Sequence, residues 1–452
     1  MLSMMDIQKR AETGPVMKSK DFDLAFARKI RELIPKYNIK YDAEQLIVDD
    51  ATADEIFQAG IELLAGVGLY NTDTQRVIQF SIEELQQVAA TARTGPDIVM
   101  FGRGKDEVCY QHRTGKDKSS PVLAAGAHGG GTVPIRQEWF SQFVQSFVQE
   151  ESNKALAITG GVPSVDGIPI KVGTPSEVYC ALWENKAMLE VLRRVGRPGM
   201  HLGLHSSVTS IGGFLALVHE GFRGRHNIQL SAHVMPELKV DWSRLTLALI
   251  VKEWDFVPWV SGMSVEGALC RGPEETAVGM IASMLGQLAY SNAIPVQIWN
   301  NTVRGEWSRS QTLWANGAAT RAAERNVRLP IGGMVTAEEQ FRGTEASLYW
   351  EAAASVLYTA CGFAYCWSTG WTGLEARFVG EILSATAGMD EQEANKLAKA
   401  IYARWVVEKE HATAPKDFPE LYDLETVKPT QDWLSTYNRV KDELARMGVP
   451  YK

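Results

Sequence analysis

The sequence predicts an α/β protein built on an eight-stranded (β/α)8 barrel, with a helical extension before it and a helical appendage after it. Short apolar segments recur along the middle of the chain, and each is followed by a segment with helical periodicity. Eight such repeats in succession are typical of a closed parallel barrel. An open doubly wound sheet is the alternative. It requires a phosphate-binding GxGxxG loop after a strand, and the nearest cluster, HGGG at 128–131, lacks that spacing.

The predicted barrel occupies residues 121–389. Its strands are expected at 121–127, 155–161, 200–206, 227–233, 256–261, 295–300, 330–335 and 362–368. Its helices are expected at 137–152, 175–195, 210–222, 242–254, 273–291, 308–323, 337–361 and 374–387. Each pair of strand and helix is one β/α unit.

Two flanking regions complete the chain. Residues 1–120 are expected to form a helical extension packed on the barrel, with helices at 22–37, 52–67 and 81–92 and a short strand and turn at 97–110. Residues 390–452 are expected to form a helical appendage with helices at 391–409 and 430–447. No low-complexity linker separates these regions from the barrel.

Composition narrows the class of protein and of partner. The chain has 452 residues, with 46 lysines and arginines against 54 aspartates and glutamates, for a net charge of −8. It carries no basic block, which argues against nucleic acid as a partner, and no apolar run long enough to span a membrane. Its five cysteines are dispersed and odd in number, which favours reduced thiols and a cytoplasmic protein over a disulfide framework.

The stretch at 196–207 is the centre of the prediction. A Gly-Arg-Pro-Gly turn at 196–199 ends the preceding helix, because proline lacks a backbone N–H and glycine adopts backbone angles that other residues avoid. In the strand that follows, alternate residues share a face, so His201, Gly203 and His205 point one way and Leu202 points into helix packing. Two interpretations remain: a cavity above the glycine flanked by imidazoles, or two histidines satisfied as polar groups at a strand end.

Polar and aromatic side chains follow the other strands, where a barrel places its catalytic groups. The candidates are Ser231, His233, Trp259, Ser261, Asn300 and Trp367. The tryptophans suit an aromatic box for a methylated cation, although core packing is their more common use. Glu338 and Glu339 follow the seventh strand, either as functional carboxylates or as acids that favour a helix N-terminus.

A zinc site is one alternative. His201, His205 and His233 form the three-histidine set that a catalytic zinc takes. However, four residues along a strand separate His201 from His205 by about 13 Å, because each residue rises about 3.3 Å. One metal ion cannot bind both unless the strand bends, and no CxxC or HExxH spacing occurs. We therefore expect no metal in the site.

Several motifs, in order along nearly the whole chain, resemble the monomethylamine methyltransferases of corrinoid-dependent methyl transfer. They are GLYNTDTQR at 68–76, GRPGM at 196–200, ELKVD at 237–241, GPEET at 272–276, TGLEAR at 372–377 and YDLETVKPT at 422–430. The resemblance implies a TIM barrel, which agrees with the pattern of strands and helices. It also implies a homo-oligomer that docks a separate small corrinoid protein over the barrel mouth.

The resemblance breaks at the family's site residues. That family carries pyrrolysine, whose imine ring captures methylamine, and matching GRPGM places Gly203 at that position. The accompanying carboxylates fall on Ser231 and Ser261, and a glutamine falls on Val327. An insertion of about four residues near 303–309 also departs from the family pattern. These differences imply a non-pyrrolysine homologue with another donor, such as a quaternary ammonium or a sulfonium, which leaves as a neutral molecule.

The resemblance and the residues together predict a methyltransferase that moves a methyl group from a small methylated donor to cobalt. We expect a catalytic set of Gly203, His201 and His205. We expect the donor to contact Ser231, His233, Ser261, Trp259, Asn300 and Trp367. No tightly bound cofactor is expected, because the chain lacks the DxHxxG motif of a corrinoid carrier, so the corrinoid would be held by the partner. Two other interpretations are a zinc-assisted enzyme for O- or S-methyl donors, using the histidines and Cys366, and a non-catalytic binding barrel.

Overall fold

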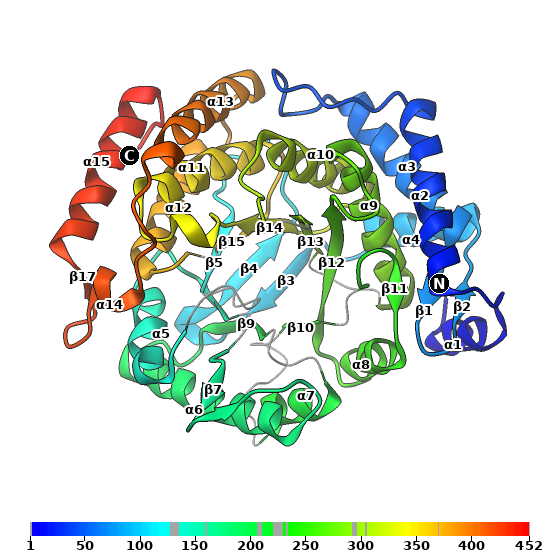
Figure 1. The fold of residues 1–452 in the computed structure, drawn as a ribbon, viewed down its shortest axis with the longest axis horizontal. Helices are drawn as coiled ribbons and strands as arrows, with labels where there is room; N and C mark the ends of the chain where they lie inside the picture. The colour runs from blue at the N-terminus through cyan, green and yellow to red at the C-terminus, as the bar shows by residue number, and fades with distance from the viewer. Residues whose placement is uncertain are drawn as a thin grey trace.

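The computed structural model describes residues 2–126, 135–158, 161–205, 210–219, 229–231, 234–291, 296–302, 305–368 and 370–451. At 157–158, 204–205, 229–231, 258–260, 296–302 and 368 it describes the backbone only. A ring of parallel strands lies at the centre, with helices around it, and the two termini lie on opposite sides (Figure 1). No helix in the described ranges is both long and apolar enough to cross a membrane.

The predicted barrel is confirmed. Its strands are β5 (Val122–Ala125), β6 (Ala155–Ile158), β9 (His201–His205), β10 (Gln229–Ser231), β12 (Val257–Glu266), β13 (Val296–Thr302), β14 (Ile331–Val335) and β15 (Tyr365–Ser368). The hydrogen-bonded order is β10-β12-β13-β14-β15-β5-β6-β9, parallel throughout. The two strands at the ends of this order, β9 and β10, contact each other and close the barrel. A small hairpin of β7 (Ser164–Val165) and β8 (Ile168–Pro169) follows β6.

A helix follows each strand, as predicted. The helices are α5 (Phe140–Val148), α6 (Pro175–Arg194), α7 (Ile211–Val218), α8 (Trp242–Glu253), α9 (Pro273–Ser291), α10 (Ser310–Val327), α11 (Glu345–Ala360) and α12 (Gly373–Thr386). The helix expected to begin at 337 begins eight residues later, at Glu345. A 3-10 turn at Glu339–Phe341 precedes it, and Gly343 has a φ of 67°, which an α-helix does not allow.

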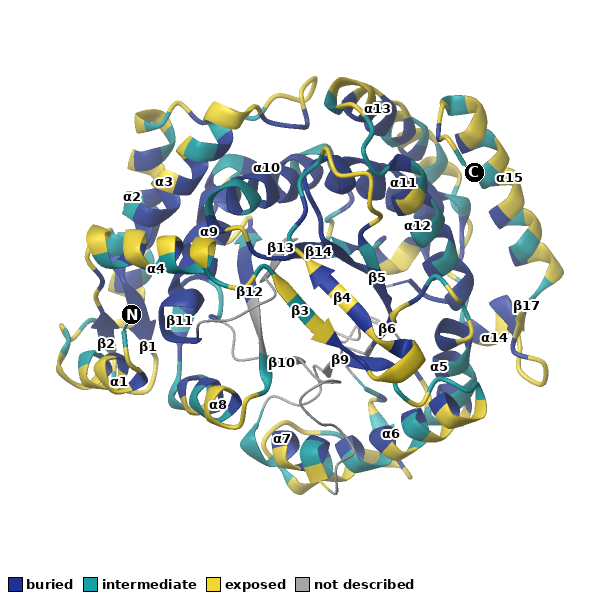
Figure 2. Ribbon diagram, turned by 180° about the vertical axis from the view of Figure 1, so that it is seen from behind, coloured by how far each residue is buried: buried dark blue, intermediate teal, exposed yellow. Residues whose placement is uncertain are grey.

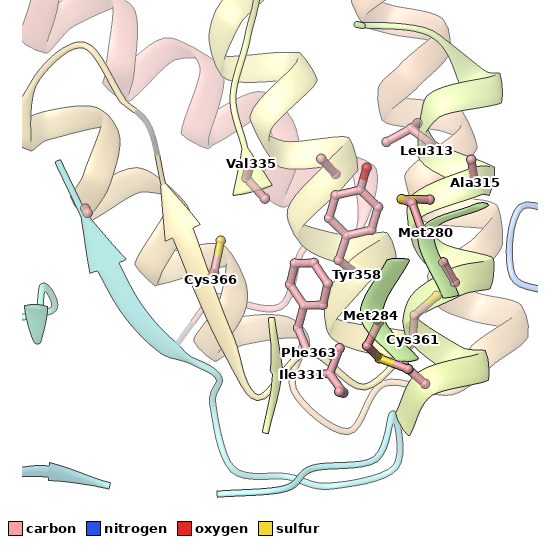
Figure 3. Close-up of a cluster of buried hydrophobic side chains, with 14 of the residues drawn as sticks. Met280, Met284, Leu313, Ala315, Ile331, Val335, Tyr358, Cys361, Phe363 and Cys366 are labelled. Carbon is pink, nitrogen blue, oxygen red and sulfur yellow. The ribbon is translucent and has the colours of Figure 1, made fainter. Parts of the chain in front are cut away.

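The main core lies between the outer faces of the strands and the helices. Met284 of α9, Leu313 of α10 and Tyr358 of α11 are buried in one cluster with Ile331 of β14 (Figure 3). Cys366 of β15 belongs to the same outer layer. Burial of an aliphatic side chain of this size stabilises the fold by about 1.5–3 kcal/mol, so this layer holds the barrel together from outside.

The helical extension packs on one side of the barrel. Its helices are α1 (Met4–Thr13), α2 (Ser19–Lys36), α3 (Asp50–Val67) and α4 (Ile82–Thr94). The sequence predicts the last three and misses α1, which is polar but starts at a Ser3 capping box and buries Met4, Ile7 and Ala11 on one face. Helix α3 crosses α9 closely, since a Cβ at Gly60 would lie 2.4 Å from Ile281. Three short strands, β1 (Leu69–Asn71), β2 (Arg76–Ile78) and β11 (Lys239–Val240), form a separate sheet.

The appendage covers the opposite side. It contains α13 (Glu391–Glu408), α14 (Phe418–Leu421), β16 (Tyr422–Asp423), β17 (Lys428–Pro429) and α15 (Gln431–Met447). Helix α13 packs along α11, and α15 contacts α11, α12 and α13. The indole Nε1 of Trp433 donates to the Thr372 hydroxyl at 3.2 Å, just before α12. The appendage is therefore attached to the loop that follows the last barrel strand.

A β-hairpin lies across the amino-terminal end of the barrel (Figure 2). Its strands are β3 (Ile98–Phe101) and β4 (Val108–Gln111), where the sequence suggested one short strand and a turn. The Arg103 N–H donates to the Gly199 carbonyl at 2.9 Å, directly before β9. Tyr110 stacks on Tyr365, the first residue of β15, with ring centroids 5.0 Å apart. The hairpin thus closes this end and leaves the carboxyl ends of the strands as the mouth.

Candidate functional site

The faces of strand β9 are as predicted for its described side chains. Leu202 is buried in the outer layer against the helices. His201 stacks on the hairpin that closes the barrel, and Gly203 faces Trp367 of β15. His201 and Gly203 therefore lie in the lumen of the barrel, which is the space between the strands.

The structure corrects the catalytic role expected for His201. This residue begins β9, so it lies at the closed amino-terminal end and not at the mouth. It is fully buried, and its ring stacks on Phe101 with centroids 3.9 Å apart. Its Nδ1 lies 3.3 Å from the Tyr110 hydroxyl. His201 is therefore a packed core residue under the hairpin, and the role of His205, whose side chain the structure does not describe, remains a prediction.

The structure also corrects the open space expected above Gly203. A Cβ built on Gly203 would lie 2.2 Å from Cη2 and 2.7 Å from Cζ3 of Trp367. Real Cβ atoms do not approach other atoms that closely, so the Trp367 ring takes the place of a side chain at 203. Trp367 is itself buried, and no described residue accepts a hydrogen bond from its Nε1. The indole of Trp367 therefore fills the lumen at this level, and its N–H donates to no acceptor in the described part of the chain.

Ser261 contributes a second polar group to the lumen. On the same strand, β12, Ser264 donates to Glu237 and lies against Cys270, on the helix side of the sheet. Because side chains alternate along a strand, Ser261 and Met263 face the lumen. The Ser261 N–H donates to Gln287 Oε1 at 3.0 Å, but its buried hydroxyl has no hydrogen-bond partner in the described part of the chain.

Five expected site residues cannot be placed as side chains. His205, Ser231, Trp259 and Asn300 lie on β9, β10, β12 and β13, where the structure describes the backbone only, and His233 lies outside the described residues. The register puts Ser231 beside Trp259 and Asn300 beside Ser264. His205 and Ser231 end their strands, whereas Trp259 and Asn300 lie within theirs, and the roles of all five side chains remain predictions.

Two further sequence assignments do not fit the lumen. Cys366, expected as a zinc ligand in one alternative, lies in the outer layer between β15 and the helices, where burial raises the pKa of its thiol. Val327, matched to the family's glutamine, is the last residue of α10 and is buried at the far end from the mouth. No group of three metal-binding side chains occurs among the described residues.

Glu237 supports the site, although the sequence did not single it out as a functional residue. Its carboxylate accepts from the Val265 N–H at 2.9 Å and from the Ser264 hydroxyl at 3.0 Å, and so holds the carboxyl end of β12. Burial raises its pKa to about 7. The only sequence signal was its place in the ELKVD motif, which says nothing of its burial.

Glu338 and Glu339 differ from each other. They precede α11 by several residues, so neither is an acid of its first turn. Glu339 is exposed and pairs with Arg342 at 3.3 Å. Glu338 is buried at the rim of the mouth, where it accepts from the Ser308 N–H and from Gln340 Nε2, both at 2.7 Å. Burial raises the pKa of Glu338.

Comparison with known proteins gives consistent matches over the whole chain. The family model for monomethylamine methyltransferase MtmB matches residues 2–449. Monomethylamine methyltransferase MtmB2 of Methanosarcina acetivorans and MtmB of Methanosarcina mazei are each 28% identical to this chain, and the alignments cover 99% of this chain and 98% of those proteins. Crystal structures of the Methanosarcina barkeri monomethylamine methyltransferase and of a hydroxylamine MtmB complex each superpose with a TM-score of 0.90 at 25% identity, over 99% of this chain and 98% of theirs.

Proposed function

Because this chain belongs to the monomethylamine methyltransferase family, we propose that it transfers a methyl group from a small methylated ammonium compound to the cobalt(I) of a separate corrinoid protein, without pyrrolysine. One observation carries the proposal. The residue that we match to pyrrolysine is Gly203, and the Trp367 ring fills the space that any side chain at 203 would enter. A site built this way has no electrophile at 203 with which to capture an amine.

The chemistry then favours a donor that needs no covalent capture. Cobalt(I) attacks the methyl carbon with its electron pair, the C–N bond breaks, and that bond's pair stays on nitrogen. The cobalt becomes methylcobalt(III). A quaternary ammonium donor leaves as a neutral tertiary amine, whereas neutral methylamine would leave as an amide anion. The protein's task is to hold the methyl group in line with cobalt and to exclude water.

The described lumen residues suit such a donor. The Trp367 indole supplies an electron-rich ring, which attracts a methylated cation more strongly than phenylalanine does. Its N–H and the Ser261 hydroxyl are available to hydrogen-bond an oxygen on the donor. We further propose that His205, Ser231, His233, Trp259 and Asn300 complete the site from the neighbouring strand ends. His201 is not part of this set.

The corrinoid is the second substrate in this proposal. We propose that it arrives on a carrier protein that docks at the mouth, because the hairpin of β3 and β4 covers the opposite end of the lumen. The chain is also proposed to act as a cytoplasmic homo-oligomer.

The test is a spectroscopic assay of methylcobalt formation. The purified protein is mixed with a cobalt(I) corrinoid carrier, or free cobalamin, and with methylamine, tetramethylammonium, a carboxylated quaternary amine or a sulfonium. We expect activity with the quaternary or sulfonium donors and none with methylamine. Activity with methylamine alone would contradict the proposed donor class. If no donor gave methylcobalt although a donor still bound to the protein, the result would indicate a non-catalytic binding barrel.

Variants connect the activity to the lumen. Trp367→Phe keeps an aromatic ring but loses the N–H and part of the cation attraction, so we expect kcat/KM for the active donor to fall roughly tenfold. Trp254→Phe is the matched control, because Trp254 is exposed at the end of α8 and contributes nothing to the lumen. Equal loss in both variants would argue against a lumen site.

A further inference from the structure

A cavity of about 520 Å³ lies at the rim of the mouth, outside the lumen. Its walls come from the loop after β13, the loop after β14 and the end of α13. The residues that matter here are Glu306, Glu338, Phe341, Trp405, Lys409 and Glu410. None of the lumen residues described above lines it, and its volume is in the range of small-molecule sites.

The cavity wall carries a buried carboxylate without a cation. Glu338 is 6% exposed, and its hydrogen-bond partners in the described part of the chain are the Ser308 N–H and the Gln340 amide, both neutral. No lysine, arginine or histidine of the described chain lies within ion-pair distance of it. A buried charge normally has a partner of opposite sign, because its desolvation is costly. Burial and the neighbouring charge of Glu306 both raise the pKa of Glu338.

The cations that line the cavity are already engaged. Arg309 Nη2 lies 2.9 Å from Glu266 Oε1. Lys409 Nζ lies 4.0 Å from Glu410 and 4.8 Å from the centre of the Trp405 ring. Glu410 is the partner of Lys409, so Glu306 and Glu338 are the described carboxylates of the cavity that form no ion pair with its two basic side chains. The balance of charge in the cavity favours a cationic ligand.

The remaining wall is aromatic. Trp405 is buried, and the edge of its ring lies against Phe341 with centroids 6.1 Å apart. From this arrangement we infer that the rim cavity binds a small organic ammonium ion. An N–H of the ligand donates to Glu338, and the alkyl groups lie against Phe341 and Trp405. This inference does not depend on the proposed methyl donor.

One wall of the cavity comes from the segment in which the sequence predicts an insertion relative to the family motifs. The segment that departs from the family pattern, near 303–309, supplies Glu306, Ser308 and Arg309. The Ser308 N–H from this segment is also the group that holds Glu338 in place. The cavity thus joins two features that the sequence raised separately, the acidic pair after the seventh strand and the insertion.

The experiment measures binding of methylammonium, trimethylammonium and tetramethylammonium to the intact protein by calorimetry or equilibrium dialysis. Glu338→Gln keeps an acceptor for the Ser308 N–H but removes the charge, so affinity for the two ions with an N–H should fall roughly tenfold. Glu339→Gln, one residue along and exposed, is the matched control and should change nothing. Tetramethylammonium, which has no N–H, should bind this cavity more weakly.

A second variant tests binding in the rim cavity independently of Glu338, and a lumen variant serves as its control. Ala412→Phe fills the cavity from the opposite wall without touching Glu338, and it should abolish the same binding. Trp367→Phe should leave it intact. Unchanged affinity in Glu338→Gln and Ala412→Phe, or loss of all ammonium binding in Trp367→Phe, would overturn the inference. The inference would also be overturned if neither the wild type nor Glu338→Gln bound an ammonium ion in this cavity while Glu338→Gln transferred methyl groups to the carrier protein more slowly. That result would indicate that Glu338 contacts the docked carrier.

Discussion

The two ends of the barrel lumen are built for different purposes. At the amino-terminal end, Phe101 and Tyr110 of the hairpin pack on His201 and Tyr365 in one aromatic stack. Two residues further along β9, about 7 Å at the rise of a strand, Gly203 faces an indole whose N–H has no described acceptor. The first end packs its rings under the hairpin, whereas the second sets the Trp367 indole, which lies edge-on to Tyr365 with centroids 6.3 Å apart, against a glycine.

This difference teaches where to look for function in the chain. Groups that pack on a covering hairpin contribute to stability and tolerate no ligand. A buried polar group that lacks a partner reduces stability, so such a group in the lumen is a candidate contact for a ligand. Substitutions at the two ends should therefore separate stability from activity.

The largest expected effect is at the closed end. Phe101→Ala removes a fully buried ring that packs on both Tyr110 and His201, and the cavity left behind should lower the free energy of unfolding by about 3–5 kcal/mol. At a temperature where the variant remains folded, the KM for the methyl donor should not change. Thermal unfolding and steady-state assays check the two parts, and a changed donor preference would show that the closed end also shapes the site.

The second largest effect on stability and turnover is expected at the contact between Gly203 of β9 and Trp367 of β15. Gly203→Ala places a methyl group 2.2 Å from the Trp367 ring, so the ring must shift. We expect a loss of about 1–3 kcal/mol in stability and roughly 100-fold in turnover, because misplacement of a positioning group is costly. The companion variant Gly203→Ala with Trp367→Leu makes room for the methyl group and should recover stability without activity. Recovery of both would mean that Trp367 only fills space.

The sequence predicts the helices and strands of this fold well, but it predicts poorly which of them contact one another. All eight strands and helices of the barrel could be located, because each has a strong apolar pattern of its own period. The faces of His201, Leu202 and Gly203 also follow from alternation along one strand. The predictions that fail are those that depend on contact with a segment far away in the sequence. The hairpin that covers His201 comes from the extension, and the ring that fills the space above Gly203 comes from the eighth strand.

A smaller, pH-dependent effect lies behind the lumen wall. Glu351 of α11 and Glu375 of α12 are fully buried, and burial raises the pKa of both carboxyls above their ordinary value of 4.5. These two groups then bind protons more tightly in the folded state than in the unfolded state, so the stability that they contribute is complete below pH 4.5 and is lost as the pH rises toward the raised values. Glu351→Gln removes one of these groups.

We expect Glu351→Gln to raise the melting temperature at pH 8 and to flatten its dependence on pH between 5 and 8. Neither oxygen of Glu351 has a described hydrogen-bond partner, so the neutral amide loses no hydrogen bond. Glu345→Gln is the control on the same helix, because Glu345 is partly exposed and pairs with Arg439. A variant that is less stable at every pH would indicate that Glu351 has a structural partner.

The smallest effect should be the most informative about the open end. Ser261→Ala removes a buried hydroxyl that has no described partner, so stability should stay within about 0.5 kcal/mol of the wild type or improve. If the hydroxyl binds the donor, KM should rise a few-fold. Ser264→Ala, three residues along β12, removes a hydroxyl bonded to Glu237 and should cost about 1–3 kcal/mol. A Ser261 variant that loses stability while KM stays constant would place this serine with the packed groups, and the functional part of the lumen would then begin further toward the mouth.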